Sequence, residues 1–529
     1  MTTRTRIAPL AMAALIALSL AGPPAASAGA QQAETAEPAI AAAPAALDFG
    51  QQQVGTTSSA QIWAYLNAGA ADVAVSATLT GTNAADFAID AGATTCGAGP
   101  VAPGASCDIG VVFTPAAEFD RVASLDVNDG SGATSIALSG VGILPASAVA
   151  WGTLRTVGPG YAWNWGQSLA RTQSGATQYL HTLYMTDSST YRGVYYVRST
   201  TGSTWSRAIR LNASTQHADR ATIATSGAYV YAVWSSIARR SFTGTQPRVL
   251  YFRRNSSNGS GSWSSVKRLS SLTGRIDYPR VAAYGADVYV TYTDAATGYI
   301  KLQVSHDRGS TWSVKTIGST TRASINGRLG VPMVAAAGTT VVVSWMATAS
   351  GVVKARSSAN RGSTWAATQT LGTGAATGSF LAIAASGTRT AVAWVNGKEI
   401  DLRVRTGTVW GPLRVVRPSP GAISYEDLWI SAVALNGTSR AGVAFEACYS
   451  GCSGSGTYLA DVLWRESANN GATWAHHQVV GTTPLGGWTE NHSPSVVWVS
   501  ATTRYVLMNR YDDGMLINRL YIRTGTGAP

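Results

Sequence analysis

Charged residues, histidines and cysteines are scarce in this chain, and their scarcity excludes several kinds of site. Lys, Arg, Asp and Glu make up 12% of the 529 residues, and there are six His and four Cys. These His and Cys are not grouped with acidic residues at the spacing of metal ligands, so we expect no metal site and no cofactor. The sequence also lacks a glycine loop that would cradle phosphates and a Ser-His-Asp signature.

Long apolar runs and helical periods are missing as well. No run of about 18 apolar residues follows residue 28, so we expect no membrane insertion. What the chain has in quantity is glycine, with 56 residues, together with β-branched and aromatic side chains. That composition favours an all-β fold of short strands joined by tight turns, and the length favours two or more domains.

Residues 1–28 predict an export signal. Arg4 and Arg6 give a positive start, residues 8–20 form a short apolar region, and Ala26-Ser27-Ala28 is a cleavage site of small residues. The apolar region is too short to span a bilayer stably. We therefore expect a secreted, extracellular protein in which residues 29–45 form a flexible lead.

The four cysteines form two local pairs, Cys96 with Cys107 and Cys448 with Cys452. An even number of cysteines in an exported chain favours two disulfides. A metal site is the alternative, but it requires His or acidic partners close by.

The net charge of +12 is unevenly distributed. Residues 45–146 contain nine acidic side chains and a single base, Arg121, so the basic excess lies in the rest of the chain. Such a distribution favours anionic partners for the larger domain, such as acidic glycans, although a solubilising basic surface explains it equally well. The basic residues form no concentrated stripe, so no nucleic-acid partner is expected.

Short alternating runs between residues 46 and 144 predict an immunoglobulin-like β-sandwich. The expected strands are Ser59–Leu66, Val73–Leu79, Cys107–Phe113, Ala123–Val127 and Ser135–Leu138. Three stretches in this segment, Leu47-Asp48-Phe49-Gly50, Pro103-Gly104-Ala105-Ser106-Cys107 and Val112-Phe113-Thr114-Pro115, resemble choice-of-anchor D domains of the ASPM/SPD-2/Hydin type. The resemblance implies an accessory module for attachment or spacing that carries no catalytic set. A spacer that binds nothing is the alternative.

From residue 150 to residue 529 the chain repeats an eight-residue turn. The intact copy is Ser305-His306-Asp307-Arg308-Gly309-Ser310-Thr311-Trp312, an S-x-D-x-G-x-T-W Asp box. Two further copies carry Asn360 and Asn469 at the acidic position and end in Trp365 and Trp474. Weaker copies end in Trp205, Trp263 and Trp410. Repeats of roughly 50 residues with four short strands each predict the blades of a β-propeller.

The seventh copy is divided between the two ends of this domain. Residues 151–157 look like a box tryptophan and its following strand, and residues 521–526 look like the strand that precedes a box. Sharing one blade between the ends would remove two unpaired strand edges, so Leu154 and Tyr521 should lie in a common sheet. We expect seven blades, with six as the alternative.

The box residues themselves are predicted to be structural. Small residues form a tight turn, the side chain of Asp307, Asn360 or Asn469 bonds to backbone N–H groups, and Trp312, Trp365 and Trp474 pack between blades. Loops that lead into each innermost strand, and loops that join second to third strands, would share the opposite face. We call this face the mouth.

Aromatic residues, arginines and carboxylates gather in the predicted mouth loops. Rings can stack on sugars, guanidinium groups can bind carboxylates, and paired acids can catalyse glycoside hydrolysis. The candidate ligand-binding residues are Trp163, Trp165, Arg220, Tyr278, Arg280, Arg328, Tyr425, Glu426, Trp429, Trp488 and Glu490. Propeller mouths collect polar loop residues in any case, so each of them can equally be an ordinary loop residue.

The Asp boxes make the large domain resemble the sialidase (BNR-repeat) superfamily over residues 151–526. That superfamily includes exo-sialidases, other glycosidases and members that only bind. The resemblance implies an arginine triad and a tyrosine nucleophile assisted by Glu, which Arg220, Arg280, Arg328 and the pair Tyr425-Glu426 could imitate. The Arg-Ile-Pro motif of sialidases is absent, since residues 165–168 read Trp-Gly-Gln-Ser. We therefore leave the catalytic residues unassigned.

Three functions remain open from the sequence. The first is a monomeric carbohydrate-binding or surface-adhesion protein that binds a glycan or cell-surface polysaccharide, anionic ones included, at the propeller mouth. The second is a sialidase-like glycoside hydrolase, which needs two carboxyl groups about 5–10 Å apart in the mouth. The third is a scaffold for protein partners.

Overall fold

The architecture is taken from a computed structural model of the whole chain. The structure describes residues 44–144, 149–158, 162–163, 168–186, 193–237, 247–273, 275–320, 331–347, 351–374, 381–417, 427–450, 459–481, 489–512 and 517–527. Within these ranges only the backbone is described for residues 162–163, 219, 427–431, 449–450, 459, 489–493, 511–512 and 517–518. The predicted export signal, and all but the last two residues of the predicted lead, lie outside the described residues.

The described part of the chain is almost entirely β-structure. Its one helical element is a 3-10 turn at Ala84–Asp86, and no helix long and apolar enough to cross a membrane occurs there. The prediction of an all-β chain is confirmed for these residues.

The first sheets form a small unit. One sheet has the order β1 (Ala46–Gln53), β7 (Ala133–Ile143), β6 (Phe119–Asn128), β3 (Ser76–Thr80), and the other β2 (Gln61–Leu66), β5 (Ser106–Phe113), β4 (Phe87–Ile89). The sheets share one core, which buries Trp63, Phe87, Phe113 and Leu125. The predicted disulfide between Cys96 and Cys107 is present. Strands β1 and β4 were not among the expected ones, because neither has a run of alternating apolar and polar residues long enough to predict a strand.

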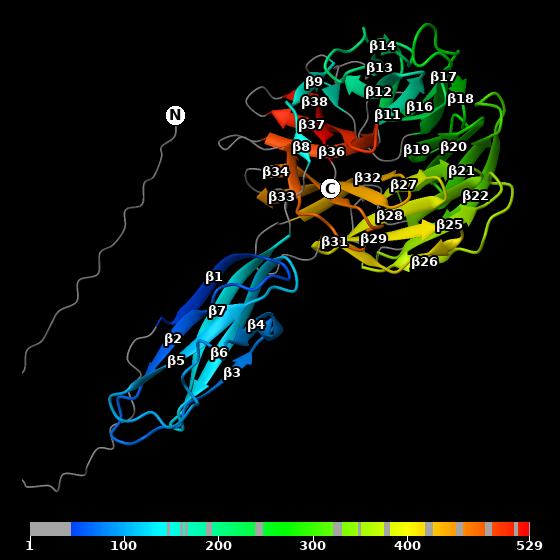
Figure 1. Ribbon diagram of the computed structural model, residues 1–529. Coiled ribbons are helices and arrows are strands. Elements are labelled where there is room, and N and C mark those ends of the chain that lie inside the picture. Colours follow the sequence, from blue (N-terminus) through cyan, green and yellow to red (C-terminus); the bar gives the residue numbers. More distant parts are fainter. Residues whose placement is uncertain are drawn as a thin grey trace, which may run out of the picture.

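The strands from β8 onward form a large unit of radial sheets (Figure 1). The first two sheets contain β10 (Ala162–Trp163), β11 (Leu169–Ser174), β12 (Thr177–Thr186), β13 (Gly193–Ser199) and β14 (Ile209–Arg210), and then β15 (His217–Ser226), β16 (Tyr229–Ile237), β17 (Arg248–Asn255) and β18 (Lys267–Arg268). The next two contain β19 (Ile276–Tyr284), β20 (Asp287–Asp294), β21 (Tyr299–Ser305) and β22 (Ser313–Ser319), and then β23 (Met333–Ala337), β24 (Thr340–Met346), β25 (Val353–Ser358) and β26 (Gln369–Gly372).

The remaining strands complete the large unit. A fifth sheet contains β27 (Ala382–Ser386), β28 (Arg389–Asn396), β29 (Glu399–Thr406), β30 (Val409–Trp410) and β31 (Arg414–Arg417). The last sheet joins β32 (Asp427–Asn436), β33 (Arg440–Ser450), β34 (Leu459–Ser467) and β35 (Gln478–Gly481) to β36 (Thr489–Trp498), β37 (Thr503–Asp512), β38 (Ile517–Thr526), β8 (Ala150–Trp151) and β9 (Arg155–Val157). Only Leu459 and Ala460 pair with β36, so this sheet is two groups of strands linked by a short parallel bridge.

The innermost strands follow one another around a common axis (Figure 1). Contacts run from β11 to β15, β19, β23, β27, β32 and β36 in turn, and β36 contacts β11. The ends of the unit meet in one sheet, because β38 pairs with β8 and β9, with Gly525 opposite Trp151 and Tyr521 opposite Thr156. Trp151, Leu154 and Tyr521 pack against one hydrophobic cluster. The two ends therefore pair as predicted, although Leu154 itself lies between β8 and β9 and not in a strand.

The box turns are held by the same set of bonds in each copy. The first serine accepts a hydrogen bond from the glycine N–H: Ser305 from Gly309 at 2.7 Å, Ser358 from Gly362 at 2.8 Å, and Ser467 from Gly471 at 2.8 Å. Asp307 accepts from Thr311 N–H at 2.8 Å, and Asn360 and Asn469 accept the equivalent bond. The ring of Trp312 lies 5.1 Å from that of Phe252 in the preceding sheet, which places it between neighbouring sheets.

The two units meet through a buried ion pair. Glu118, just before β6, receives two hydrogen bonds from Arg465 of β34, at 2.7 and 2.9 Å. Both side chains are almost fully buried. Beside them the guanidinium of Arg417 lies 5.0 Å from the centre of the Phe119 ring. The small unit is thus joined to the large one by side chains. Figure 1 shows the two units next to each other.

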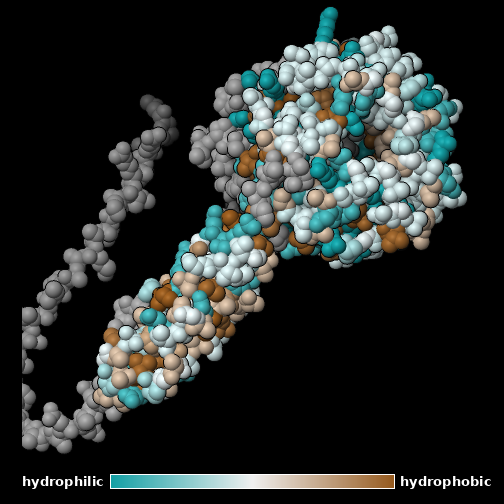
Figure 2. All heavy atoms as spheres, in the orientation of Figure 1, coloured by the Kyte–Doolittle hydropathy of each residue, from teal (hydrophilic) through white to brown (hydrophobic). Residues whose placement is uncertain are grey.

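On the face shown in Figure 2, hydrophobic atoms occur as separate small groups among hydrophilic ones. Such scattered exposure is ordinary for a soluble surface. It gives no reason to place a binding site on the outer surface of that face.

Candidate functional site

Four innermost strands of the described residues, β15, β19, β32 and β36, are interrupted by β-bulges near their start, and the side chains at the bulge are described for β15 and β19. In β15 the pairing with β16 skips Arg220, and in β19 the pairing with β20 skips Tyr278 and Pro279. Arg220 and Tyr278 have positive φ angles of 56° and 49°, which non-glycine residues rarely adopt. Bulges redirect side chains and are common beside functional sites, and such backbone strain persists only where the surroundings hold it.

The bulges bring the residues of neighbouring sheets together in a cluster. The guanidinium of Arg220 lies 3.9 Å from the centre of the Tyr278 ring. Arg220 Nε donates to Asp277 Oδ1 at 3.1 Å, and Arg248 Nη1 lies 3.3 Å from Asp277 Oδ2. We call Arg220, Arg248, Asp277, Tyr278 and Arg280 the arginine cluster.

Arg280 is the most deeply buried member of the arginine cluster, with 4% of its surface exposed. Its Nη1 donates to the carbonyl of Pro279 at 3.0 Å, and its Nε has no hydrogen-bond partner among the described residues. Burial, together with the nearby charge of Arg220, lowers the pKa of Arg280 to about 10. The side chain therefore stays charged at neutral pH.

The electrostatic balance of the cluster favours an anion. The guanidinium groups of Arg220 and Arg248 both contact the carboxylate of Asp277, and the buried Arg280 adds a third positive charge close to Arg220. The five residues named thus carry three positive charges and one negative charge. Arginine forks match carboxylate and sulfate oxygens well, and a buried N–H without a partner gains most from such a bond. Tyr278 offers little free ring surface, since Arg220 covers one face and Tyr278 also packs in a buried cluster with Val331 and Met333.

Three of the predicted mouth residues therefore lie together, namely Arg220, Tyr278 and Arg280. Trp163, Trp429 and Glu490 are placed only by their backbones, in β10, β32 and β36. Trp165, Arg328, Tyr425, Glu426 and Trp488 lie outside the described residues. Arg220, Tyr278 and Arg280 all belong to the early halves of innermost strands, as the assignment of loops to faces predicted.

Arg248 was missed by the sequence reasoning. It is the first residue of β17 and forms an isolated parallel bridge with Arg275, which places it next to β19. The available signal was its position directly after a loop that joins a second to a third strand. Asp277 had the clearer signal, since it stands beside Tyr278 in the sequence.

The second cysteine pair is only partly visible. Cys448 of β33 is disulfide-bonded. Its predicted partner, Cys452, lies outside the described residues. In the part of the chain that the structure describes, no three His, Cys, Asp or Glu residues are grouped as metal ligands.

Comparison with known proteins gives only distant likenesses. No known protein family and no curated protein matches the chain. Among solved structures, a protein of unknown function from Dyadobacter fermentans is 11% identical with a TM-score of 0.43, and the match covers 72% of this chain and all of that one. The six-bladed fucose-binding lectin of Aleuria aurantia is 13% identical with a TM-score of 0.39, over 62% of this chain and all of the lectin. Trypanosoma rangeli sialidase is 12% identical with a TM-score of 0.40, over 72% of this chain and 59% of the sialidase.

Proposed function

We propose that this protein is a secreted carbohydrate-binding protein that uses the mouth of a seven-bladed propeller to bind an acidic glycan. In this proposal the large unit is an Asp-box (BNR-repeat) propeller. The small unit is an immunoglobulin-like module of the choice-of-anchor D type, which holds the propeller away from a surface. The protein acts as a monomer, without a cofactor or a nucleic-acid partner.

The arginine cluster is the observation that carries the proposal. Arg280 is a permanent positive charge in a buried position, and its Nε is left without a partner by the described residues. Two strained residues, Arg220 and Tyr278, hold the cluster at the start of the innermost strands. A ligand that brings a carboxylate or sulfate group would complete these hydrogen bonds, and its sugar ring would extend into the mouth.

Binding of the exported, full-length chain to a panel of acidic and neutral polysaccharides tests the proposal. We expect acidic members to bind, and to bind more weakly at high salt because exposed charges are screened. Arg280→Gln and Arg220→Gln should each weaken that binding by about tenfold, the equivalent of roughly 1.4 kcal/mol. Arg207→Gln is the matched control, because Arg207 is exposed and lies far from the mouth, just after the box tryptophan Trp205.

The outcome separates the proposed function from its alternatives. Equal binding of acidic glycans by the Arg220→Gln and Arg207→Gln variants would contradict the role of the arginine cluster. Failure to bind any glycan would contradict the whole proposal and favour a scaffold for protein partners. Release of fluorophore from glycoside substrates by the unmodified chain would show that the protein is a glycoside hydrolase and does not only bind glycans.

A further inference from the structure

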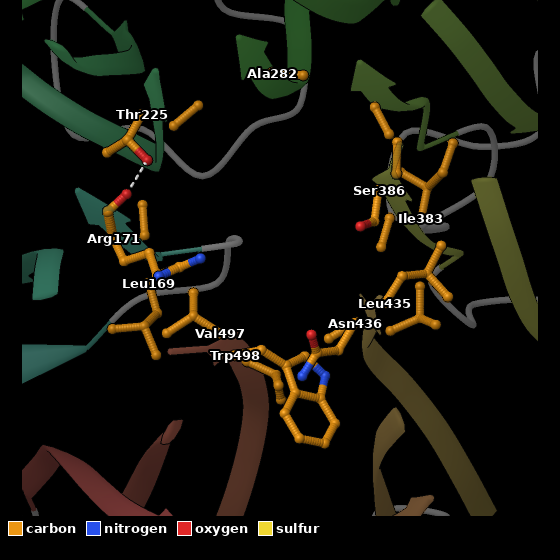
Figure 3. Close-up of a pocket in the computed structure, with 18 of the residues that line it drawn as sticks. Leu169, Arg171, Thr225, Ala282, Ile383, Ser386, Leu435, Asn436, Val497 and Trp498 are labelled. Carbon is orange, nitrogen blue, oxygen red and sulfur yellow. Dashed lines mark hydrogen bonds between the residues drawn. The ribbon is translucent and has the colours of Figure 1, made fainter. Parts of the chain in front are cut away.

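A cavity of about 490 Å³ occupies the axis of the large unit (Figure 3). Every innermost strand in the described ring contributes to its lining, β11 with its first half and β15, β19, β32 and β36 with their second halves. In β15 the lining begins at Ile223, three residues beyond Arg220, and in β19 it begins at Val281, directly after Arg280. The cavity reaches Ser386, Asn436 and Ser500, which adjoin the turns on the box side of the ring. It adjoins the arginine cluster at β19, but no residue of that cluster is among those that line it.

The strands that line this cavity leave backbone groups facing it. Strands β11, β15, β19, β23, β27 and β32 each stand at an end of their sheet, and β36 has a second partner only at Thr489 and Glu490. The free edge of a strand presents unpaired N–H and C=O groups. Some of these groups are bonded to side chains, since the carbonyls of Arg171 and Ser500 accept from Thr225 and Asn436. Any edge groups without such a partner need water or a ligand to satisfy them.

Side chains add a regular pattern to this wall. Each innermost strand contributes an aliphatic residue followed by a small or aliphatic one, as in Ile223-Ala224, Val281-Ala282 and Val334-Ala335. The third position varies around the ring. It is alanine in β19, β23 and β27, whereas β11 and β36 carry Arg171 and Trp498. The side chains of one half are therefore small and apolar, between polar backbone groups, whereas the strands of the other half carry the larger Arg171 and Trp498.

Arg171 is the one charged residue among those that line the cavity. Its hydrogen bonding within the described residues is limited to a long bond from Nη1 to the carbonyl of Val499, at 3.4 Å. The remaining N–H groups of its fork are thus available to a ligand. Ser386 lies on the opposite wall in Figure 3 and contributes a hydroxyl group.

From these features we propose a second binding site, for a small molecule that combines an apolar ring with one anionic group. The anion binds to Arg171, and the ring lies against the alanine side of the cavity, formed by Ala283, Ala336 and Ala385. The cavity volume is within the range of small-molecule sites. Because Arg171 is the single cation of the lining, it fixes the orientation of the ligand, with the anionic group beside β11 and the ring on the alanine side. This site goes beyond the proposed function and does not depend on the arginine cluster.

Two fluorescent probes of nearly equal shape test the proposal with the full-length chain. 8-Anilinonaphthalene-1-sulfonate carries a sulfonate, and N-phenyl-1-naphthylamine is its neutral counterpart. We expect Arg171→Gln to weaken binding of the sulfonate about tenfold and to change binding of the neutral amine less than about twofold. Ala336→Met narrows the cavity on the alanine side and should weaken the binding of both probes.

Controls locate the bound probe. Arg220→Gln in the arginine cluster and Arg207→Gln on the exposed surface should leave both affinities unchanged. Sulfonate binding that is insensitive to both Arg171→Gln and Ala336→Met would overturn the proposal. Equal weakening of both probes by Arg171→Gln would overturn the assignment of the anion to Arg171. Loss of sulfonate binding in Arg220→Gln alone would show that the probe occupies the mouth.

Discussion

Removing the carboxylate of Glu118 should strongly destabilise the junction between the two units. Arg465 makes four hydrogen bonds: two to Glu118, one from Nη1 to the carbonyl of Val416, and one from Nε to the carbonyl of Ala475 at 3.0 Å. Its side chain is only 1% exposed. Glu118→Ala would leave this charge buried without a counter-ion, which costs about 3–5 kcal/mol.

A double-mutant cycle tests the physical cause of that loss. Replacing both partners, as in Glu118→Met with Arg465→Met, removes the buried charges together and should cost less than either single change. Urea unfolding followed by tryptophan fluorescence gives the four free energies of unfolding. A loss of unfolding free energy below about 1 kcal/mol for Glu118→Ala would refute the reasoning. So would a loss for the double variant that equals the sum of the losses for the two single variants.

Three further predictions concern the ring itself. Asp307→Asn should lower the free energy of unfolding by less than about 1 kcal/mol, because Asn360 and Asn469 make the equivalent bonds. Asp307→Ala should lower it by roughly 1–3 kcal/mol. Urea unfolding of the two variants measures both losses. Trp151→Ala should cost about 3 kcal/mol, because the ring packs against the last sheet and its Nε1 donates to Gln478, and the shift of the thermal midpoint measures this. Burial keeps His181 neutral and lowers its pKa to about 3, so below its unfolded pKa of 6.5 the unfolded state binds the extra proton. His181 should then contribute a loss of stability of up to about 1.4 kcal/mol for each unit by which the pH falls from 6.5 towards 3. His181→Gln should remove this contribution in unfolding measured at pH 7 and pH 5, whereas His477, whose pKa is also lowered to about 3, keeps its own.

The repeating turns could be predicted because each one needs particular chemistry at fixed positions. A tight turn that ends in a packed tryptophan requires an acceptor, a glycine and the ring at set spacings, and that local requirement is visible in the sequence. The pairing of Tyr521 with Thr156 also followed from the repeat, since a missing half-unit at each end implies a shared sheet.

The arginine cluster could be predicted only in part. Counting strands predicts that Arg220, Tyr278 and Arg280 share one face, but their contact depends on two bulges. A bulge leaves no reliable trace in the residue pattern, and it changes which side chains meet across neighbouring sheets. Arg248 stands directly after a loop that joins a second to a third strand, but its contact with Asp277 of another sheet is not visible in the sequence.

The weaker copies of the box show which part of the repeat the ring needs. Ser199 accepts a hydrogen bond from Gly202 N–H at 2.8 Å, and Asn255 accepts one from Gly259 N–H at 2.8 Å, although neither copy has the acidic residue of the intact box. Ser305 makes the same bond in the intact copy. An acceptor at the end of the third strand, bonded to the glycine N–H, is thus shared by the strong copies and these two weak ones, and the acid adds further bonds to the turn. In the copy that ends in Trp410 the N–H of Gly407 bonds to the carbonyl of Thr388 instead. Because these turns depend on so little chemistry, the acidic position can vary without loss of the turn. The loops of the opposite face lie outside this constraint, so their residues are free to vary.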